Sequence, residues 1–446
     1  MKNVRELALE ALLNIEKKQA YSNLLINNYL DSGKLSKKDA GLFTEMVYGT
    51  IQRSMTLDYY LTPYLEKQKK LQDWVRVLLR LTLYQMVYLD KVPERAAIFE
   101  AVEIAKKQGH KGVASVVNGV LRSIQRQGLP NLEELENDLD RISIATSHPR
   151  WLVEKWIEQY GVENTERMCE MNLVPPSQTV RVNTAKATVE EVISMLRTQG
   201  FDVDKGDLAE DSIVSNKGNL AFSNAYKNGY ITIQDESSML VARTLGVTEG
   251  DTVFDSCAAP GGKSTHIAEL LKGTGTVFST DLHEHKIRLI KEQATRLNLP
   301  NIKVQTLDSR KAQEVFEIEQ FDRVLVDAPC SGFGVIRRKP DLKFTKTMED
   351  VKQLASVQLS ILEQVAPLVK KGGTLVYSTC TIDKEENTEV VKAFLENNPD
   401  YKIDFNIKDL LPASLETYIK DGMLQLLPHY FGTDGFFIVR LKRQVL

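Results

Sequence analysis

Short runs rich in β-branched residues alternate with helical stretches in the second half of the chain, and this alternation constrains the fold most. Strands separated by helices favour a parallel sheet buried on both faces. The runs span residues 252–257, 275–281, 302–308, 321–327 and 374–380. The sequence therefore predicts an α/β domain over residues 234–446. Two further apolar runs, 423–427 and 436–441, are expected to form a hairpin at the sheet edge.

The first half of the chain follows two other patterns. Residues 1–130 carry apolar side chains at spacings of three and four, which is typical of amphipathic helices, and few strand signals. Residues 131–145 are rich in acidic side chains and predict a linker. Residues 146–233 mix helical and strand-like runs, which indicates a small α/β module. The chain is therefore expected to be multidomain, with an all-α domain in front.

Positive charge gathers in the first domain. The whole chain has a net charge of −3, but residues 1–130 hold 20 lysines and arginines against 13 aspartates and glutamates. Clustered basic residues bind phosphates, so this bias is a mild indication of a nucleic acid partner. Helices with solvated basic faces explain the charge equally well.

Several classes of protein do not fit the sequence. No apolar run approaches the roughly 18 residues of a membrane span, and no apolar signal core is present at the start. The four cysteines are 50 or more residues apart, which fits neither a disulfide framework nor a CxxC metal site. His283 and His285 are expected on a solvated helix face. We therefore expect a cytoplasmic protein without metal or membrane partner, and by default a monomer.

Unusual residues stand where the predicted strands end. They are Cys257 with the glycine run after it, Asp281, Asp308, the segment from Asp327 to Cys330, and Cys380. In an open α/β sheet, ligands bind outside the carboxyl ends of the strands. The five strand ends are therefore expected to converge on one site.

The first strand end, residues 255–264, carries a glycine-rich loop. Gly261 and Gly262 allow close approach of the backbone to a ligand, and the helix that follows favours an anion or carboxylate at its start. The loop nearly matches a phosphate-binding P-loop, but Cys257 replaces the first glycine. A triphosphatase, with Lys263 on the phosphates and 324–327 as the magnesium strand, remains an alternative.

Two aspartates favour a nucleoside ligand over a triphosphate alone. Asp281 ends its strand about 20 residues after the glycines, where acidic groups bind ribose hydroxyls. Asp308 ends the next strand and is placed to reach the base. Each aspartate on its own could equally be a helix cap, but two at successive strand ends favour adenosine.

Cys330 and Cys380 place two thiols at neighbouring strand ends. A thiolate is a suitable nucleophile for a soft, electron-poor carbon. The alternative of a redox-active disulfide is disfavoured by a reducing compartment. Cys169 lies on an amphipathic helix with Met168 and Met171 and is expected to be a small buried hydrophobe. From the residues alone, either member of the thiol pair can be the nucleophile.

The segments Asp327-Ala-Pro-Cys-Ser-Gly and Ser378-Thr-Cys-Thr resemble the Sun/Fmu-type (RsmB) RNA cytosine-5 methyltransferases. The resemblance extends over essentially the whole chain. It implies a NusB-like RNA-binding domain in front, a small RNA-contacting module in the middle, and a Rossmann-like domain that binds S-adenosylmethionine. The NusB-like domain implies 16S ribosomal RNA as the substrate and rRNA processing as the role.

The same resemblance assigns residues to roles. It implies catalytic roles for Cys380 as the nucleophile towards C6 of cytosine, for Cys330 in product release, and for Asp327 and Lys263 in charge stabilisation and orientation. The implied S-adenosylmethionine pocket consists of Cys257, Ala258, Ala259, Pro260, Gly261, Gly262, Lys263, Asp281, Asp308 and Asp327. DNA cytosine-5 methyltransferases attack with the cysteine of their Pro-Cys motif, so Cys330 is the alternative nucleophile.

Basic and polar residues outside the strand ends are candidates for contact with the RNA backbone. They are Arg181 and Asn183 in the middle module, and Arg337, Arg338 and Lys339 after the fourth strand end. A solvated loop explains the last three equally well. Two alternatives remain for the whole protein: a methyltransferase acting on transfer RNA or DNA, and an RNA-binding factor with a degenerate nucleotide domain.

Overall fold

The structure is a computed structural model that describes residues 2–18, 22–66 and 71–445. The chain forms two compact units. The N-terminal unit comprises residues 1–175 together with 336–345, and the C-terminal unit comprises residues 176–335 together with 346–446. The division after residue 175 splits the segment 146–233 that the sequence predicts to be a single module.

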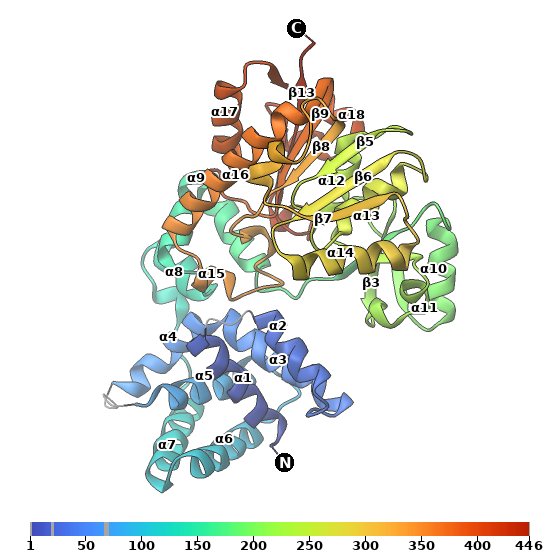
Figure 1. The fold of residues 1–446 in the computed structure, drawn as a ribbon. Coiled ribbons are helices and arrows are strands. Elements are labelled where there is room, and N and C mark those ends of the chain that lie inside the picture. The colour runs from blue at the N-terminus through green and yellow to red at the C-terminus, as the bar shows by residue number, and fades with distance from the viewer. Residues whose placement is uncertain (1, 19–21, 67–70, 446) are drawn as a thin grey trace. The chain divides into compact units, whose positions relative to one another are not determined.

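The N-terminal unit is helical (Figure 1). Apolar residues at spacings of three and four, such as Leu7, Ala11 and Ile15, are buried in one core, which confirms the predicted helical packing. Its helices are α1 (Val4–Lys18), α2 (Ser22–Asp31), α3 (Lys37–Gln52), α4 (Ser54–Leu65), α5 (Asp73–Tyr88), α6 (Glu94–Gln108), α7 (Lys111–Gln127), η1 (Leu132–Glu134), α8 (Asp138–Ala145), α9 (Arg150–Met171) and α15 (Leu342–Thr345).

The segment 131–145 differs from the expected linker, because its second half forms α8. The side chain of Asn137 caps this helix by accepting a hydrogen bond of 2.8 Å from the backbone N–H of Asp140. Ile142 is fully buried, so α8 packs into the unit. The helical run expected at the start of the segment 146–233 is present as α9, but Gly161, with a φ of 80°, interrupts its helical geometry.

The C-terminal unit begins with a small antiparallel sheet in the order β2-β3-β1-β4. Thr188 and Glu191 form a capping box at the start of α10, whose apolar face covers the sheet. The elements are β1 (Gln178–Val182), α10 (Val189–Thr198), β2 (Asp202–Lys205), β3 (Ser212–Lys217), η2 (Leu220–Phe222), α11 (Asn224–Lys227) and β4 (Ile231–Ile233). The strands and helix predicted for residues 178–233 are confirmed.

The larger sheet has the order β11-β12-β13-β9-β8-β5-β6-β7, and β10 also pairs with β13. The five strands from β9 to β7 are parallel, as predicted. β12 and β13 form the expected hairpin, and β13 pairs antiparallel with β9. The strands are β5 (Thr252–Asp255), β6 (Thr276–Asp281), β7 (Ile302–Thr306), β8 (Phe321–Asp327), β9 (Val369–Thr379), β10 (Tyr401–Ile403), β11 (Ile419–Lys420), β12 (Met423–Leu426) and β13 (Phe436–Arg443).

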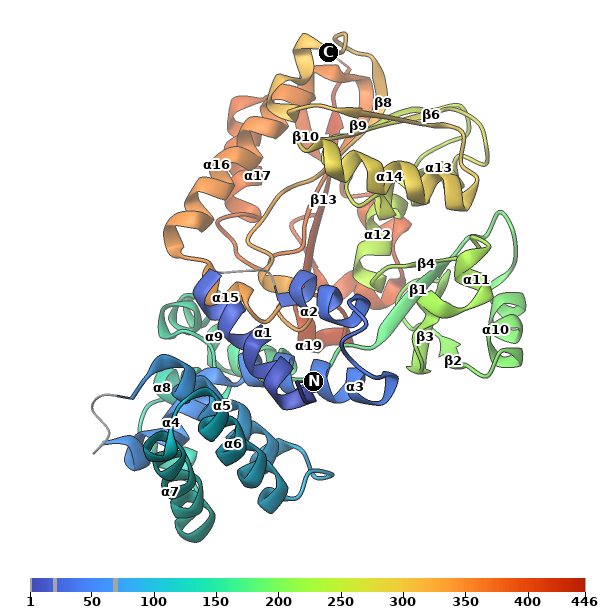
Figure 2. The ribbon, with the colours of Figure 1, turned by 60° about the horizontal axis from the view of Figure 1, so that its bottom comes forward.

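Helices cover both faces of the larger sheet (Figure 2). Successive residues of a strand point to opposite faces of the sheet and belong to different hydrophobic cores. In β5, for example, Val253 packs with α12 and α13, and Phe254 packs with α16. The helices of this part are α12 (Glu236–Leu245), α13 (Gly262–Leu270), α14 (Glu284–Leu297), η3 (Ser309–Glu314), η4 (Phe333–Val335), α16 (Met348–Val365), η5 (Ala366–Leu368), α17 (Thr388–Asn397), α18 (Ile407–Leu410), η6 (Ala413–Tyr418) and α19 (Pro428–Phe431). The order of the parallel strands reverses at β5, which leaves a crevice at their carboxyl ends.

Across the described ranges, none of the helices combines the length and the apolar character that crossing a membrane requires.

Candidate active site

The glycine-rich loop connects the end of β5 at Asp255 to the start of α13 at Gly262. Gly261 has a φ of 109°, and a Cβ at this position would lie 3.2 Å from the Cα of Ile290 in α14. Glycine alone combines this φ with so close an approach. The loop therefore brings the start of α13 close to α14.

Asp255 anchors the loop. Its Oδ2 accepts a hydrogen bond of 2.6 Å from the Ser264 hydroxyl, which accepts one of 2.8 Å from the Ser279 hydroxyl. Burial raises the pKa of Asp255 to about 7, against the opposing effect of the Ser264 hydrogen bond. These contacts tie β5, α13 and β6 together beside the glycine-rich loop.

A cavity of about 490 Å³ lies at the carboxyl ends of the parallel strands. All five predicted strand ends contribute to its lining, which confirms their convergence on one site. The predicted residues that line it are Cys257, Ala259, Asp281, Asp308, Asp327, Cys330 and Cys380. The lining does not include Ala258, Pro260, Gly261, Gly262 or Lys263, which belong to the loop and the first turn of α13.

Asp281 and Asp308 line the cavity, and each also contacts the residues that follow its strand, but only Asp308 caps a helix. Asp281 Oδ1 lies 3.5 Å from Lys286 Nζ and accepts a hydrogen bond from the backbone N–H of His283. Asp308 caps η3 through the backbone N–H of Arg310, whose guanidinium lies 2.7 Å from Asp308 Oδ2. The hydrogen bond from Arg310 lowers the pKa of Asp308 and keeps it an acceptor. Asp308 is therefore a helix cap, as one of the two alternatives predicts, and its place in the cavity lining leaves the binding of a nucleoside as a prediction.

Helix α16 supplies a wall of the cavity that the sequence reasoning missed. Leu354, Val357 and Ile361 line it. Their spacing of three and four residues puts them on one face of the helix. This spacing is the sequence pattern from which the apolar wall could have been predicted. His283 is exposed as expected, but it also lines the cavity from the residue before α14.

The two predicted thiols meet at the ends of β8 and β9. Cys330 Sγ lies 3.3 Å from Cys380 Sγ, and neither cysteine forms a disulfide. The hydrogen bond with Cys380 and burial both raise the pKa of Cys330. Gly334 packs closely against the backbone of Cys380, because a Cβ there would lie 1.9 Å from the carbonyl oxygen of Gly435 and 2.7 Å from that of Cys380.

Lys263 and Asp327 form an ion pair beside the thiols. Lys263 Nζ lies 2.8 Å from Asp327 Oδ2, and the Ser378 hydroxyl donates a hydrogen bond of 2.8 Å to Asp327 Oδ1. Burial alone would lower the pKa of Lys263, but the Asp327 carboxylate outweighs it and the pKa is raised. The Lys263 side chain does not line the cavity, but its ion pair with Asp327 holds a positive charge beside it.

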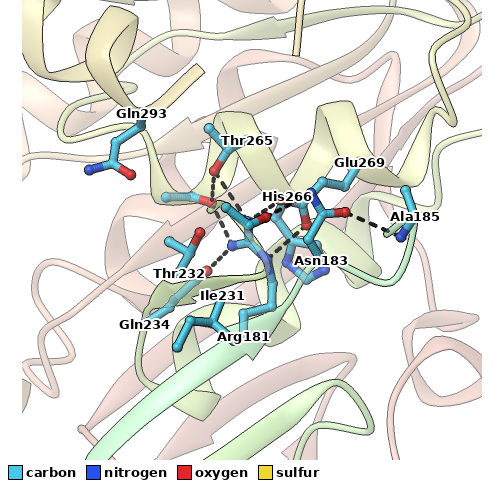
Figure 3. Close-up of polar contacts among 12 residues, drawn as sticks. Arg181, Asn183, Ala185, Ile231, Thr232, Gln234, Thr265, His266, Glu269 and Gln293 are labelled. Carbon is cyan, nitrogen blue, oxygen red and sulfur yellow. Dashed lines mark hydrogen bonds and ion pairs between the residues drawn. The ribbon is translucent and has the colours of Figure 1, made fainter. Parts of the chain in front are cut away.

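Arg181 does not face RNA, which corrects the expectation from the sequence (Figure 3). It is fully buried and pairs with both carboxylate oxygens of Glu269 in α13, at 3.1 and 3.0 Å. It also donates to the carbonyl of Gly262 at 2.9 Å and to the side chain of Gln234. Asn183 is buried too, so neither side chain is available to a phosphate.

The basic run after the fourth strand end is not a plain solvated loop. Arg337 is buried and donates to the carbonyls of Val174 and Pro175 at 3.1 and 3.2 Å, all within the N-terminal unit. Arg338 is half-buried and Lys339 is exposed. Cys169 is buried as expected, and burial raises its pKa to about 12. In the described part of the chain, no group of three or more His, Cys, Asp or Glu side chains could hold a metal ion.

Three protein-family models match this chain. Residues 242–442 match the family described as 16S rRNA methyltransferase RsmB/F. Residues 2–126 match the NusB family, and residues 148–219 match the ferredoxin-like domain of RsmF/B-like methyltransferases. The three matches follow one another along the chain in the order that the sequence resemblance implies.

Curated and solved proteins are similar over nearly the full length. The chain is 56% identical to the "Probable ribosomal RNA small subunit methyltransferase B" of Bacillus subtilis (strain 168), over 99% of both chains. It is 33% identical to the ribosomal RNA small subunit methyltransferase B of Photorhabdus laumondii, over 94% of this chain and 97% of the relative. The solved structure of PH0851 has a TM-score of 0.80 at 27% identity and covers 99% of this chain and 98% of its own.

The cofactor of such enzymes is S-adenosylmethionine, and the cavity residues fit it. Asp281 and Asp308 supply carboxylate acceptors for hydroxyl and amino groups, and α16 supplies an apolar wall. Ala259 and Cys257 bring the glycine-rich loop to the cavity. Sequence, domain order and site thus agree, and the chain belongs to the RsmB/F family of S-adenosylmethionine-dependent 16S rRNA methyltransferases.

Proposed function

We propose that this protein transfers a methyl group from S-adenosylmethionine to C5 of a cytosine in 16S ribosomal RNA, through a covalent bond between Cys380 and C6 of the base. The observation that carries the proposal is the pair of reduced thiols 3.3 Å apart in the cavity lining. A ring nitrogen or a hydroxyl needs no thiol to take a methyl group. Carbon C5 does, because it becomes nucleophilic only after a thiolate adds to C6.

Cys380 is the better nucleophile of the two. The hydrogen bond with Cys380 is the largest cause that raises the pKa of Cys330, which favours the proton on Cys330 and the thiolate on Cys380. The Cys380 thiolate also contributes to the raised pKa of Lys263, so this cation lies within its field. A negative Cys380 beside a positive Lys263 is the arrangement that activates a thiol.

The chain's own residues account for the addition step. Cys380 sulfur bonds to C6, and the electron pair of the C5–C6 double bond becomes available at C5. When bound, S-adenosylmethionine supplies the electrophilic methyl group. As negative charge develops at ring atom N3, a proton from solvent adds there, and the Asp327 carboxylate accepts the hydrogen bond from the resulting N3–H until that proton returns to solvent on elimination. Lys263 and the Ser378 hydroxyl hold Asp327 in place for this contact.

Cys330 fits the release step. The proton on C5 must leave and the bond between sulfur and C6 must break, which returns the electron pair to Cys380 as a thiolate. While Cys380 is bonded to C6, its hydrogen bond and charge no longer raise the pKa of Cys330, although burial and the charge of Glu386 still do. Cys330 then loses its proton to solvent more readily than in the free enzyme, and its thiolate takes the proton from C5. The same thiol is thus a hydrogen-bond donor first and a base later.

The substrate assignment depends on the family and on the front domain. The target cytosine must leave any base stack to reach the cavity, which costs least in a single-stranded loop. We assign RNA binding to residues 1–130, which match the NusB family over 2–126, and the chemistry to residues 234–446. The relatives are named for the small-subunit ribosomal RNA.

Transfer of labelled methyl from S-adenosylmethionine to protein-free 16S ribosomal RNA tests the function. We expect label in 5-methylcytosine after digestion of the RNA to nucleosides. Label in another nucleoside would refute attack through C6. Label in transfer RNA alone would replace the substrate. Absence of transfer to either RNA, with RNA binding retained, would favour the non-catalytic factor, and binding of ATP in place of S-adenosylhomocysteine would favour a triphosphatase.

A further inference from the structure

One buried carboxylate beside the thiols has no role in the steps above. Glu386 lies in the segment after β9, and it is fully buried. Its Oε2 accepts hydrogen bonds from the backbone N–H of Ser331 at 2.8 Å and from Gln358 Nε2 at 2.9 Å. Its Oε1 accepts one from the Ser331 hydroxyl. Both oxygens therefore face donors, which is the pattern of an ionised carboxylate.

These contacts join the residues that directly follow the two cysteines. Ser331 follows Cys330, Thr381 follows Cys380, and their hydroxyl oxygens are 2.8 Å apart. The single proton of the Ser331 hydroxyl is donated to Glu386, so Thr381 must donate to Ser331. The hydroxyls thus form one directed chain from Thr381 through Ser331 to Glu386. This chain fixes the two cysteine loops against each other at the point where their sulfur atoms meet.

Helix α16 closes the arrangement from its other side. The amide of Gln358 donates to Glu386 Oε2 and, at 2.9 Å, to the carbonyl of Pro329, the residue before Cys330. Both amide hydrogens are used, which fixes the orientation of the side chain. Glu386 and Gln358 together hold the backbone on both sides of Cys330. The Tyr377 hydroxyl in turn holds the carbonyl of Glu386.

We propose that Glu386 is a positioning residue that holds Cys330 against Cys380 through Ser331 and, by its negative charge, keeps the proton of the thiol pair on Cys330. The nucleophile is thereby selected before the substrate arrives. This role of Glu386 rests on the proposed covalent mechanism, in which Cys380 is the nucleophile. It concerns the free enzyme and involves no covalent step.

The charges around the thiols agree with this role. The ionisable groups near the two thiols are Tyr377 from β9, Asp327 from β8, Lys263 from α13, and Glu386 with Asp383 from the segment after β9. After the hydrogen bond with Cys380, burial and the charge of Cys380, Glu386 contributes to the raised pKa of Cys330. Lys263 is instead bonded to Asp327, and its raised pKa depends partly on Cys380. Negative charge thus acts on Cys330 and positive charge on Cys380.

Alkylation of the full-length protein by iodoacetamide, followed by peptide mass spectrometry, measures the rate at which each thiol reacts as a function of pH. In the wild type we expect Cys330 to react with a midpoint at higher pH than Cys380. Glu386→Gln removes the charge while keeping the shape, and we expect it to lower the Cys330 midpoint by about one pH unit or more. An unchanged Cys330 midpoint in a folded Glu386→Gln protein would overturn the proposal.

Glu236→Gln is the matched control, because Glu236 is also buried and accepts from two backbone N–H groups and a serine hydroxyl. It should leave both midpoints unchanged.

If Glu386→Gln does not fold, Ser331→Ala replaces it. We expect faster Cys330 alkylation above its midpoint, since the loop is released, and a wild-type rate would contradict the proposal. The assay contains neither RNA nor methyl donor. Its result therefore does not depend on whether the protein methylates ribosomal RNA, and failure of the proposed function can be told apart from failure of this proposal.

Discussion

Lys263 keeps its charge chiefly because of its ion pair with Asp327. A buried ammonium ordinarily loses its proton more easily, but the Asp327 carboxylate 2.8 Å away reverses this effect and raises the pKa of Lys263. The pair places a positive charge beside Cys380 and orients the Asp327 carboxylate towards the cavity. Each partner therefore depends on the other for its role in the proposed reaction.

Substitution of Lys263 by methionine should lower kcat/KM for methyl transfer by about 100-fold, because Asp327 and the Cys380 thiolate lose their cation. Steady-state transfer to 16S ribosomal RNA measures the effect. Lys272→Met is the control, since Lys272 is an exposed lysine just after α13. Equal activity of Lys263→Met and the wild type would show that the ion pair has no part in catalysis.

The sequence predicts the residues at the strand ends well, and it fails for Arg181. The position of Asp281 or Cys380 follows from parallel topology, since every strand in such a sheet ends on the same edge. Arg181 has the pattern of a charged residue on a strand, which suggests an exposed ligand for RNA. Its partner Glu269 lies 88 positions away, so no local pattern reports the burial.

Two arginines join the small sheet to the helices of the larger one. Arg181 of β1 contacts α13 through Glu269 and Gly262. Arg296 of α14 donates in the reverse direction, to the carbonyls of Tyr226 and Ile231 at 2.7 and 2.9 Å. The small sheet therefore holds the start of α13, which directly follows the glycine-rich loop.

Arg181→Met should destabilise the C-terminal unit by about 3–5 kcal/mol, because Glu269 would stay buried without its partner. Chemical denaturation of the full chain measures this loss, and binding of S-adenosylhomocysteine should weaken with it. The double variant Arg181→Met/Glu269→Met should recover much of the stability. If Arg181→Met instead bound RNA more weakly and kept its stability, Arg181 would contact RNA after all, against what its burial indicates.

At the scale of the whole molecule, the chain passes between its two units three times. Residues 336–345 directly follow the Cys330 loop and η4, yet they belong to the N-terminal unit. Lys343 of this segment is fully buried there and donates to the carbonyl of Gln52 at 2.8 Å. The sequence predicts neither this insertion nor the boundary after residue 175, because both depend on tertiary contacts between distant segments.

Lys343 should make the stability of the N-terminal unit depend on pH. Burial lowers its pKa to about 7 from 10.5, so above pH 7 the unfolded chain binds the extra proton and stability rises with pH. The rise should continue to about pH 9, where Cys169, with a pKa raised to about 12 from 9.0, begins to oppose it. Over this window the gain is about 2 kcal/mol.

Hydrogen exchange in the N-terminal unit between pH 7 and 9, corrected for intrinsic rates, checks this dependence. Lys343→Met should flatten the profile, and Lys106→Met, which removes an exposed lysine of α6, should leave it as in the wild type. A Lys343→Met protein that keeps the wild-type slope would show that another group titrates.

The central claim is that Cys380 attacks and Cys330 releases, and trapping of the protein on RNA tests it most directly. Cys330→Ala and Cys380→Ala are each incubated with S-adenosylmethionine and 16S ribosomal RNA and analysed on denaturing gels. We predict a covalent protein–RNA complex with Cys330→Ala, because addition proceeds and elimination is blocked. We predict neither complex nor methyl transfer with Cys380→Ala. A covalent complex formed by Cys380→Ala, or methyl transfer by it, would contradict the account and make Cys330 the nucleophile.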